Sequence, residues 1–280
     1  MELANSAWNR RKRALITAAA SGVLLIAIGI GAIILILDGS SLATNLAQRN
    51  LPPSWQHPFG TDWLGRDMFV RTVEGLALSI RIGLTAAVCS AAIAAVVGLA
   101  AASFGKSADR LLTWLIDLFL SVPHLVTLIL IAFVCGGGMK GVVVGVALTH
   151  WPSLARVIRA EAMQLRSAEY TQVSRKLGYS SWHVALRHML PHIAPQWLVG
   201  LLLLFPHAIL HEAAITFIGL GLSPHEPAIG IILSESMRYL SIGMWWLALF
   251  PGIGLVAIVR AFDRLGEHLR MMFDPRHSRE

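Results

Sequence analysis

The stretch Leu76–Phe104, which reads LALSIRIGLTAAVCSAAIAAVVGLAAASF, decides the fold class of this chain. Its only charged side chain is Arg81. At about 1.5 Å per residue, a helix of this length crosses the roughly 30 Å hydrocarbon core of a bilayer. Because a helix satisfies its own backbone hydrogen bonds where water is absent, this stretch predicts a membrane-spanning helix.

The rest of the chain has the same character. Hydrophobic residues make up 55% and charged residues 14% of the 280, far from the balance of a soluble domain. Other apolar segments of spanning length lie at 14–37, 111–134, 141–158, 196–222 and 244–262. The sequence therefore predicts an all-α membrane protein, with about six transmembrane helices in a single domain that covers residues 1–280.

The placement of Lys and Arg predicts the orientation of these spans. With six alternating spans, 17 of the 23 Lys and Arg residues fall on the side of the N-terminus and five on the opposite side. We therefore expect cytoplasmic segments at 1–13, 159–195 and 263–280, and an extracytoplasmic segment at 38–75. Topology and anionic lipid headgroups account for the net charge of +7, so a nucleic-acid partner is not expected.

The polar interruption 159–195 carries a recognisable layout. Gly178 follows the helical run Glu169–Leu177, and Leu190-Pro191 lies a dozen residues further on. This layout resembles the cytoplasmic EAA loop of ABC-importer permeases, with Gln172-Val173-Ser174 in the place of Glu-Ala-Ala. The glycine and the Leu-Pro pair match that consensus, and the other positions depart from it. The resemblance implies that an ATPase on another chain grips the permease at this loop.

The loop also has a physical reading of its own. Tyr170, Val173 and Leu177 share one helical face, and the basic pair Arg175-Lys176 flanks it. A short helix with an apolar face suits a groove on a partner protein. The alternative is that the same face packs against the protein's own helices.

A turn and a second helix are expected after this face. Gly178 permits a sharp turn, Ser180 or Ser181 can cap the next helix, and Pro191 and Pro195 are expected to end it. That helix is expected to present Trp182, Ala185, Leu186 and Met189 on one side. The predicted coupling residues are Glu169, Tyr170, Gln172, Val173, Ser174, Arg175, Gly178, Leu190 and Pro191.

Further motifs narrow the resemblance. Residues 57–67, HPFGTDWLGRD, resemble the HPLGTDxxGRD signature of the C-type permease of dipeptide, oligopeptide and nickel importers. Residues 212–221, EAAITFIGLG, resemble the E-x-x-LSFLGLG segment of that family, and Trp245-Trp246, Pro251-Gly252 and Asp274-Pro275-Arg276 resemble its later elements. The tryptophan that usually follows the last glycine-rich segment is missing after Pro227, which leaves the substrate in doubt.

The signature at 57–67 lies in the expected extracytoplasmic segment. Its glycines are expected to set turns, and its charged residues can form a local ion network. Such a turn-rich piece can also act as a plug or as a rest for a substrate-binding protein. The predicted signature residues are Gly60, Thr61, Asp62, Gly65, Arg66 and Asp67.

The resemblance implies a type I ABC importer permease in the inner membrane, with both termini cytoplasmic. It implies a translocation path for peptides or nickel and other metal complexes, beside a homologous second permease, two ABC ATPase subunits and an external binding protein. This chain is then not an enzyme, binds no cofactor and leaves ATP-Mg to the ATPase subunits. The sequence supports that assignment, because Gly105-Lys106-Ser107 would need a glycine at position 100 to form a phosphate loop and Ala100 stands there.

Ionisable residues inside membrane segments are costly and point to function. We assign Asp117, His124, His207, His211 and Glu212 to the candidate translocation path. His207 and His211 lie four residues apart on one helix face, where two imidazoles can chelate a divalent cation. Two ligands are half a site, however, and each histidine can equally well form a hydrogen bond with a neighbouring helix, so no firm metal site is predicted.

Two other functions were weighed. A self-sufficient cation channel or secondary transporter would use Asp117, His124, His207 and Glu212 as a relay and would work without ATP. An intramembrane metalloenzyme is disfavoured, because His211-Glu212-Ala213-Ala214-Ile215 ends in isoleucine where a His-Glu-x-x-His motif needs its second histidine.

Overall fold

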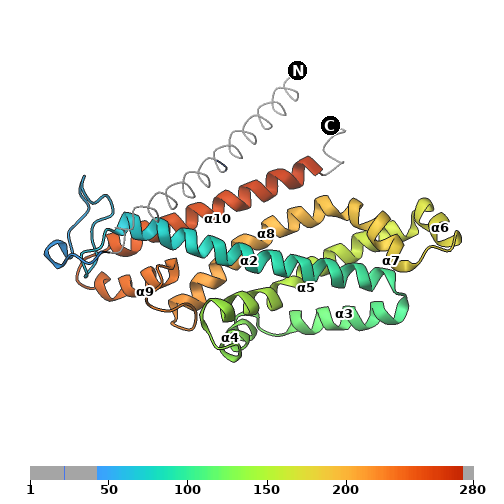
Figure 1. Cartoon of the computed structure of the whole chain (residues 1–280), viewed down its shortest axis with the longest axis horizontal. Helices are drawn as coiled ribbons and strands as arrows, with labels where there is room; N and C mark the ends of the chain where they lie inside the picture. Colours follow the sequence, from blue (N-terminus) through green and yellow to red (C-terminus); the bar gives the residue numbers. More distant parts are fainter. Residues whose placement is uncertain (1–21, 23–42, 274–280) are drawn as a thin grey trace, which may run out of the picture.

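The computed structural model describes Gly22 and residues 43–273, and the described chain is an all-α bundle, as predicted. Apart from Gly22, the first predicted span at 14–37 lies outside the described residues, as does the end of the tail from residue 274. The long helices are α2 (Met68–Ser103), α5 (Gly138–Ser167), α8 (Leu190–Phe217) and α10 (Trp246–Phe273) (Figure 1). The shorter elements are η1 (Leu46–Gln48), α3 (Lys106–Ser121), α4 (His124–Val134), α6 (Glu169–Lys176), α7 (Ser181–Val184), η2 (Ala185–Met189) and α9 (Ile229–Leu240).

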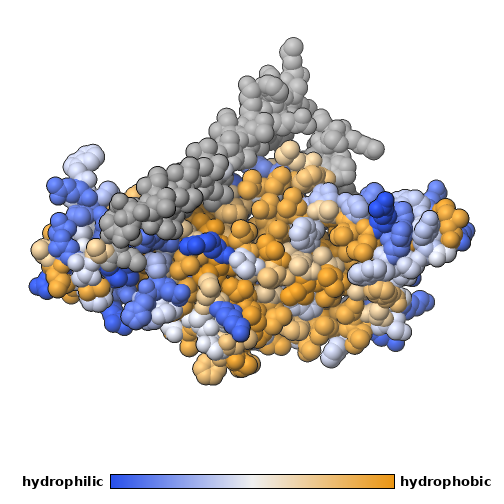
Figure 2. Space-filling model, viewed as in Figure 1, coloured by the Kyte–Doolittle hydropathy of each residue, from blue (hydrophilic) through white to orange (hydrophobic). Residues whose placement is uncertain are grey.

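Within the described residues, four helical stretches are long and apolar enough to cross a membrane, or five if the bent pair α3 and α4 counts as one. Three of the four are α2, α5 and α10, and the fourth runs without a break from α7 through η2 into α8. The face seen in Figure 2 has hydrophobic side chains over its middle and hydrophilic ones toward both ends. This distribution fits a bundle whose long axis runs across a bilayer.

The third predicted segment, 111–134, is not one straight span. The chain breaks between α3 and α4 with a bend of 97°. The residue before Pro123 is extended, with ψ of 140° at Val122, because the proline ring disfavours helical geometry at the preceding position. Pro123 itself then stands as the N-cap of α4.

The prediction that Pro191 and Pro195 end a helix is wrong. Both lie in the first turns of α8, which continues from Leu190 to Phe217. Pro191 is the second residue of α8, directly after a π-helical turn, whereas Pro195 lies inside the helix, a position at which membrane-spanning helices tolerate proline. The preceding residues Ala185–Met189 form the π-helical turn η2, which absorbs the change in hydrogen-bond register.

Prolines inside the long helices leave carbonyls without their usual partner, and at Pro152 and Pro251 a side chain satisfies the carbonyl. The indole of Trp151 donates to the Leu148 carbonyl at 3.0 Å. Pro152 would be the usual backbone donor to this carbonyl, but it has no N–H. In the same way, Ser236 donates at 2.8 Å to the Leu247 carbonyl freed by Pro251. Ser236 belongs to α9, a helix that the hydropathy analysis did not predict and that packs against α10.

Small residues let α2 and α5 approach closely, as is common between membrane helices. Ala91 and Ala94 of α2 are fully buried, and a Cβ added at Gly98 would come within 2.8 Å of the Ala155 carbonyl on α5. Larger residues such as Phe205, Ile209 and Ile232 form the core around α8 and α9. The tightly packed pair α2 and α5 runs along the long axis of the bundle (Figure 1). The segments that the sequence singled out lie toward the two ends of this axis.

Two opposite ends and a histidine cluster

The segments that the sequence singled out lie at opposite ends of the molecule. Figure 1 shows α6 and α7 at one end, together with the junction between α2 and α3, and residues 43–67 with α9 toward the other. This arrangement agrees with the expected placement of the loop and the signature on opposite membrane faces. The orientation of the termini stays a prediction.

The end formed by α6 and α7 exposes a group of apolar side chains, which we call the α6–α7 surface. On α6 and just after it, Val173 is 55% and Leu177 is 72% exposed. The group consists of Tyr170, Val173, Leu177, Tyr179, Trp182 and Leu186. Val173 and Leu177 of the predicted face are therefore open, whereas the ring of Tyr170, which is partly exposed, also lies against His188 and His192 of the protein's own helices.

Local hydrogen bonds hold the two short helices in a defined hairpin. Gly178 has φ of +87°, in the left-handed region that glycine adopts without cost. Ser180 accepts from the His183 amide at 3.2 Å and so caps α7, as one of the two predicted serines was expected to do. Ser174, which is buried, lies 3.2 Å from Nε2 of His188 and joins α6 to η2.

The face expected on the second helix is divided in the structure. Trp182 and Leu186 are exposed, whereas Ala185 and Met189 are buried in the core. The π-helical turn that begins at Ala185 shifts the angular position of the residues that follow it, which applies to Met189 and not to Ala185 itself. Leu190 and Pro191 accordingly belong to the start of α8 and lie beside the α6–α7 surface.

At the opposite end, Asp62 is the centre of the signature segment. It is 2% exposed, and its carboxylate accepts from the Leu64 and Arg66 amides at 2.8 and 2.9 Å. It also receives Arg66 Nε at 2.7 Å and Arg71 at 3.1 Å, while Arg71 pairs with Glu235 of α9 at 2.7 Å. Arg71 and Glu235 were missed at the sequence level because they lie outside the motif, and they connect the signature to α2 and α9.

Asp67 has a different role from the one expected in that network. It caps α2 by accepting from the Phe69 and Val70 amides, and its other oxygen lies 2.7 Å from Nδ1 of His57. Gly60 and Gly65 have φ of +71° and +73°, which confirms the predicted turns. Thr61 is fully buried and accepts from the Leu51 amide at 2.8 Å. The signature is thus a compact, internally bonded segment.

The candidate path residues do not all come together. Asp117 is 57% exposed and pairs with Arg156 at 2.6 Å, and Glu212 is fully buried and receives the Thr216 hydroxyl at 3.0 Å. His207 points its ring to an exposed position, so the predicted pair of His207 and His211 is not the grouping that forms. The relay of acidic and imidazole groups proposed from sequence is dispersed over separate positions.

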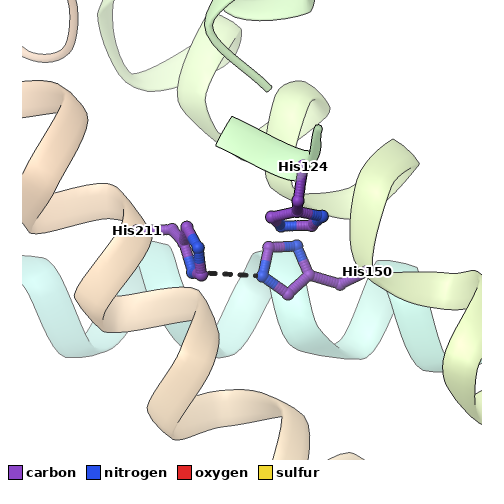
Figure 3. Close-up of side chains that lie close together, drawn as sticks. All are labelled: His124, His150 and His211. Atoms are coloured by element: carbon purple, nitrogen blue, oxygen red, sulfur yellow. Dashed lines mark hydrogen bonds between the residues drawn. The ribbon is translucent and has the colours of Figure 1, made fainter. Parts of the chain in front are cut away.

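His211 instead meets His124 and His150. The three rings come from α8, α4 and α5 and face one another in Figure 3, with ring centres 4.4 to 4.9 Å apart. His150 was not among the path residues predicted from the sequence. Its grouping with the other two depends on the bend between α3 and α4. The hydrophobic periodicity of the sequence does not predict this bend.

An all-α bundle with four or five helical stretches long enough to cross a bilayer, among the described residues, is the architecture of a multi-pass membrane protein. Residues 94–270 match the family described as binding-protein-dependent transport system inner membrane component. The chain belongs to this family, the permeases of ABC importers.

Curated relatives agree with this membership. The dipeptide transport system permease protein DppC of Bacillus subtilis is 30% identical over 98% of this chain and 86% of its own length. Proteins of Brucella abortus and Brucella suis, each named "putative peptide transport system permease protein", are similar to nearly the whole chain. The first is 35% identical over 92% of this chain and 87% of its own length. The second is 36% identical over 91% of this chain and 86% of its own length.

Proposed function

We propose that this chain is one of two permease subunits that form the peptide path of an importer driven by ATP on separate ABC ATPase subunits. An external binding protein delivers the peptide to the end that carries residues 43–67. The ATPases dock at the α6–α7 surface, on the cytoplasmic side. The names of the relatives support a peptide cargo, and they do not name nickel or another metal.

The observation that carries the coupling proposal is the exposure of the α6–α7 surface. Apolar side chains such as Val173 and Leu177 are exposed at the tip of the bundle, beyond the apolar middle seen in Figure 2, where burial by a partner would remove them from water. Gly178 and the cap at Ser180 give the hairpin one defined shape. A rigid, apolar projection can pass a displacement of the ATPases to α5 and α8, the two helices that flank it in the chain.

The alternative is a self-sufficient cation channel or secondary transporter. It is weakened by the dispersal of its relay, because Asp117 pairs with Arg156 at an exposed position and Glu212 is bonded to Thr216. Transport without ATP is the behaviour that separates this alternative from the proposed function.

The test is uptake by proteoliposomes that contain this chain, the second permease and the ATPases, with the binding protein outside and ATP inside. A radiolabelled dipeptide should accumulate only when ATP and the binding protein are both present. Dipeptide or cation uptake that is unchanged without ATP would refute the importer mechanism. Uptake of ⁶³Ni²⁺ without any dipeptide uptake would refute the peptide cargo and leave the ATP-driven mechanism in place.

A further inference from the structure

The histidine cluster has the composition of a metal-binding site. One nitrogen from each of His124, His150 and His211 lies within 4.8 Å of the other two. Three imidazoles are the protein ligands of a common class of Zn²⁺ site, in which Zn–N distances are about 2.0–2.1 Å. Ligand nitrogens stand about 3.4 Å apart around a tetrahedral zinc ion. Ring rotations that move the nitrogens by an ångström or so would therefore bring them to this spacing.

The hydrogen bonds of the cluster fix the protons on two of its rings. Nδ1 of His150 lies 3.0 Å from the Val146 carbonyl, and Nδ1 of His211 lies 2.7 Å from the His207 carbonyl. Carbonyls only accept, so each Nδ1 carries the proton and each Nε2 has a lone pair. The lone pair of His150 Nε2 accepts from Nδ1 of His211 at 3.4 Å, the contact drawn in Figure 3, and a metal ion would replace this long hydrogen bond. This arrangement, an N–H held by a backbone carbonyl, is the outer-shell contact that orients metal-bound histidines.

The third ring supplies an independent observation. Nε2 of His124 is inaccessible to solvent and has no hydrogen-bond partner among the residues that the structure describes. A buried polar atom without a partner costs free energy, and a ligand would relieve that cost. The ring stands edge-on to both His150 and His211, at 84° and 73°, which places its nitrogens beside theirs (Figure 3).

We infer that His124, His150 and His211 form a binding site for one borderline divalent transition-metal ion, of the class of Zn²⁺, Co²⁺ or Ni²⁺. Three neutral nitrogen ligands select this class over Mg²⁺ and Ca²⁺, which prefer oxygen. The fourth coordination position is left for water or an anion, because His124 and His211 are only partly buried. The site is independent of the cargo and does not require that metal be transported.

The position of the site suggests what the ion would do. His124 is the first residue of α4, directly after the 97° break, while His150 is in the middle of α5 and His211 is in α8. A bound ion would therefore tie the break to two long helices. Because an ion that binds only the folded arrangement stabilises it by mass action, metal should raise the unfolding temperature of the permease.

The test uses the full-length chain in detergent, purified through a tag that contains no histidine and stripped with a chelator. Binding of Co²⁺ is followed by its visible absorption, and Zn²⁺ by equilibrium dialysis with elemental analysis. The test variant is His124→Gln with His211→Gln, at two partly buried positions. The matched control is His207→Gln, one turn from His211 on the same helix, because His207 is exposed and is not one of the three residues whose nitrogens come together.

The wild-type chain and His207→Gln should each bind one Co²⁺ with the intense absorption of a low-coordinate nitrogen site. The double variant should bind at least about 100-fold more weakly, since loss of an outer-shell contact alone costs 10–100-fold. The same ion should raise the unfolding temperature of the wild-type chain and of the control. Equal affinity in the wild-type chain and the double variant would overturn the site, as would the absence of any Co²⁺ absorption from the wild-type chain.

A folding defect can be told apart from lost ligands. Size-exclusion chromatography and circular dichroism should give the same profiles for all variants, and the single variants His124→Gln and His211→Gln should each show the loss of affinity on a folded chain. Folded single variants that retain the wild-type affinity would overturn the assignment. Uptake of dipeptide is measured separately. A failure of the chain to bind metal would therefore refute the metal site and would not refute the proposed transport function.

Discussion

Replacing Gly178 with Val is the sharpest test of the α6–α7 surface. A Cβ at this position would meet no atom within 4 Å, so the change creates no clash. Its cost is the backbone conformation at φ of +87°, which costs a residue with a side chain about 1–3 kcal/mol. Each 1.4 kcal/mol is a tenfold change, so the population of the docking-competent hairpin should fall by roughly 5- to 150-fold.

The expected result is loss of the ATPases while the bundle stays intact. Gly178→Val should insert into the membrane normally but recover far less ATPase on co-purification, and ATP-driven dipeptide uptake should fall in parallel. Gly178→Asn should be close to wild type, since asparagine tolerates the left-handed region. These quantities are measured by quantitative co-purification and by uptake in proteoliposomes.

A control of equal strain exists at the other end of the molecule. Gly243, in the turn between α9 and α10, has φ of +89° and also has no atom within 4 Å of an added Cβ. Gly243→Val should therefore carry the same backbone cost and keep the ATPases bound. If Gly178→Val retains wild-type ATPase recovery and uptake, the assignment of the α6–α7 surface to coupling is wrong.

Two further predictions concern the opposite end and the orientation. Asp62→Asn removes one of the two carboxylates that pair with the buried Arg71, the other being Glu235, and should lower the free energy of unfolding by about 1.5–3 kcal/mol. Asp67→Asn, which keeps an N-cap acceptor, should cost about 1 kcal/mol or less, and equal unfolding temperatures for the two variants would contradict this account. For orientation, single cysteines at the exposed positions Lys176 and Ser54, without the two native cysteines, should react with an impermeant maleimide from the cytoplasm and from outside, respectively. Labelling of both from the same face would refute the predicted topology.

The ion network of the signature segment could be predicted from the sequence only in part. Asp62, Arg66, Gly60 and Gly65 were identified from the motif, because turn residues and adjacent opposite charges act over a few positions. Arg71 and Glu235 were not identified, although they complete the same network. They are 164 positions apart in the chain, and only the packing of α9 against α2 brings them together.

What the sequence determined by itself was local or additive. Apolar segment length decided that the chain is an all-α membrane protein, since backbone groups must be satisfied in lipid whatever their neighbours are. Gly178 and Ser180 similarly decided the turn and the cap of the coupling hairpin, because both depend on the conformation of only a few residues.

Only the tertiary structure decided where the helices bend and what they enclose. The sequence predicted one span at 111–134, and the bend of 97° before Pro123 appears only in the structure, where α4 packs against α5. That bend brings His124 to His150 and His211, whereas spacing along one helix had favoured the pair of His207 and His211. Helical periodicity identifies residues on one face of one helix, and it carries no information on which faces of three different helices meet.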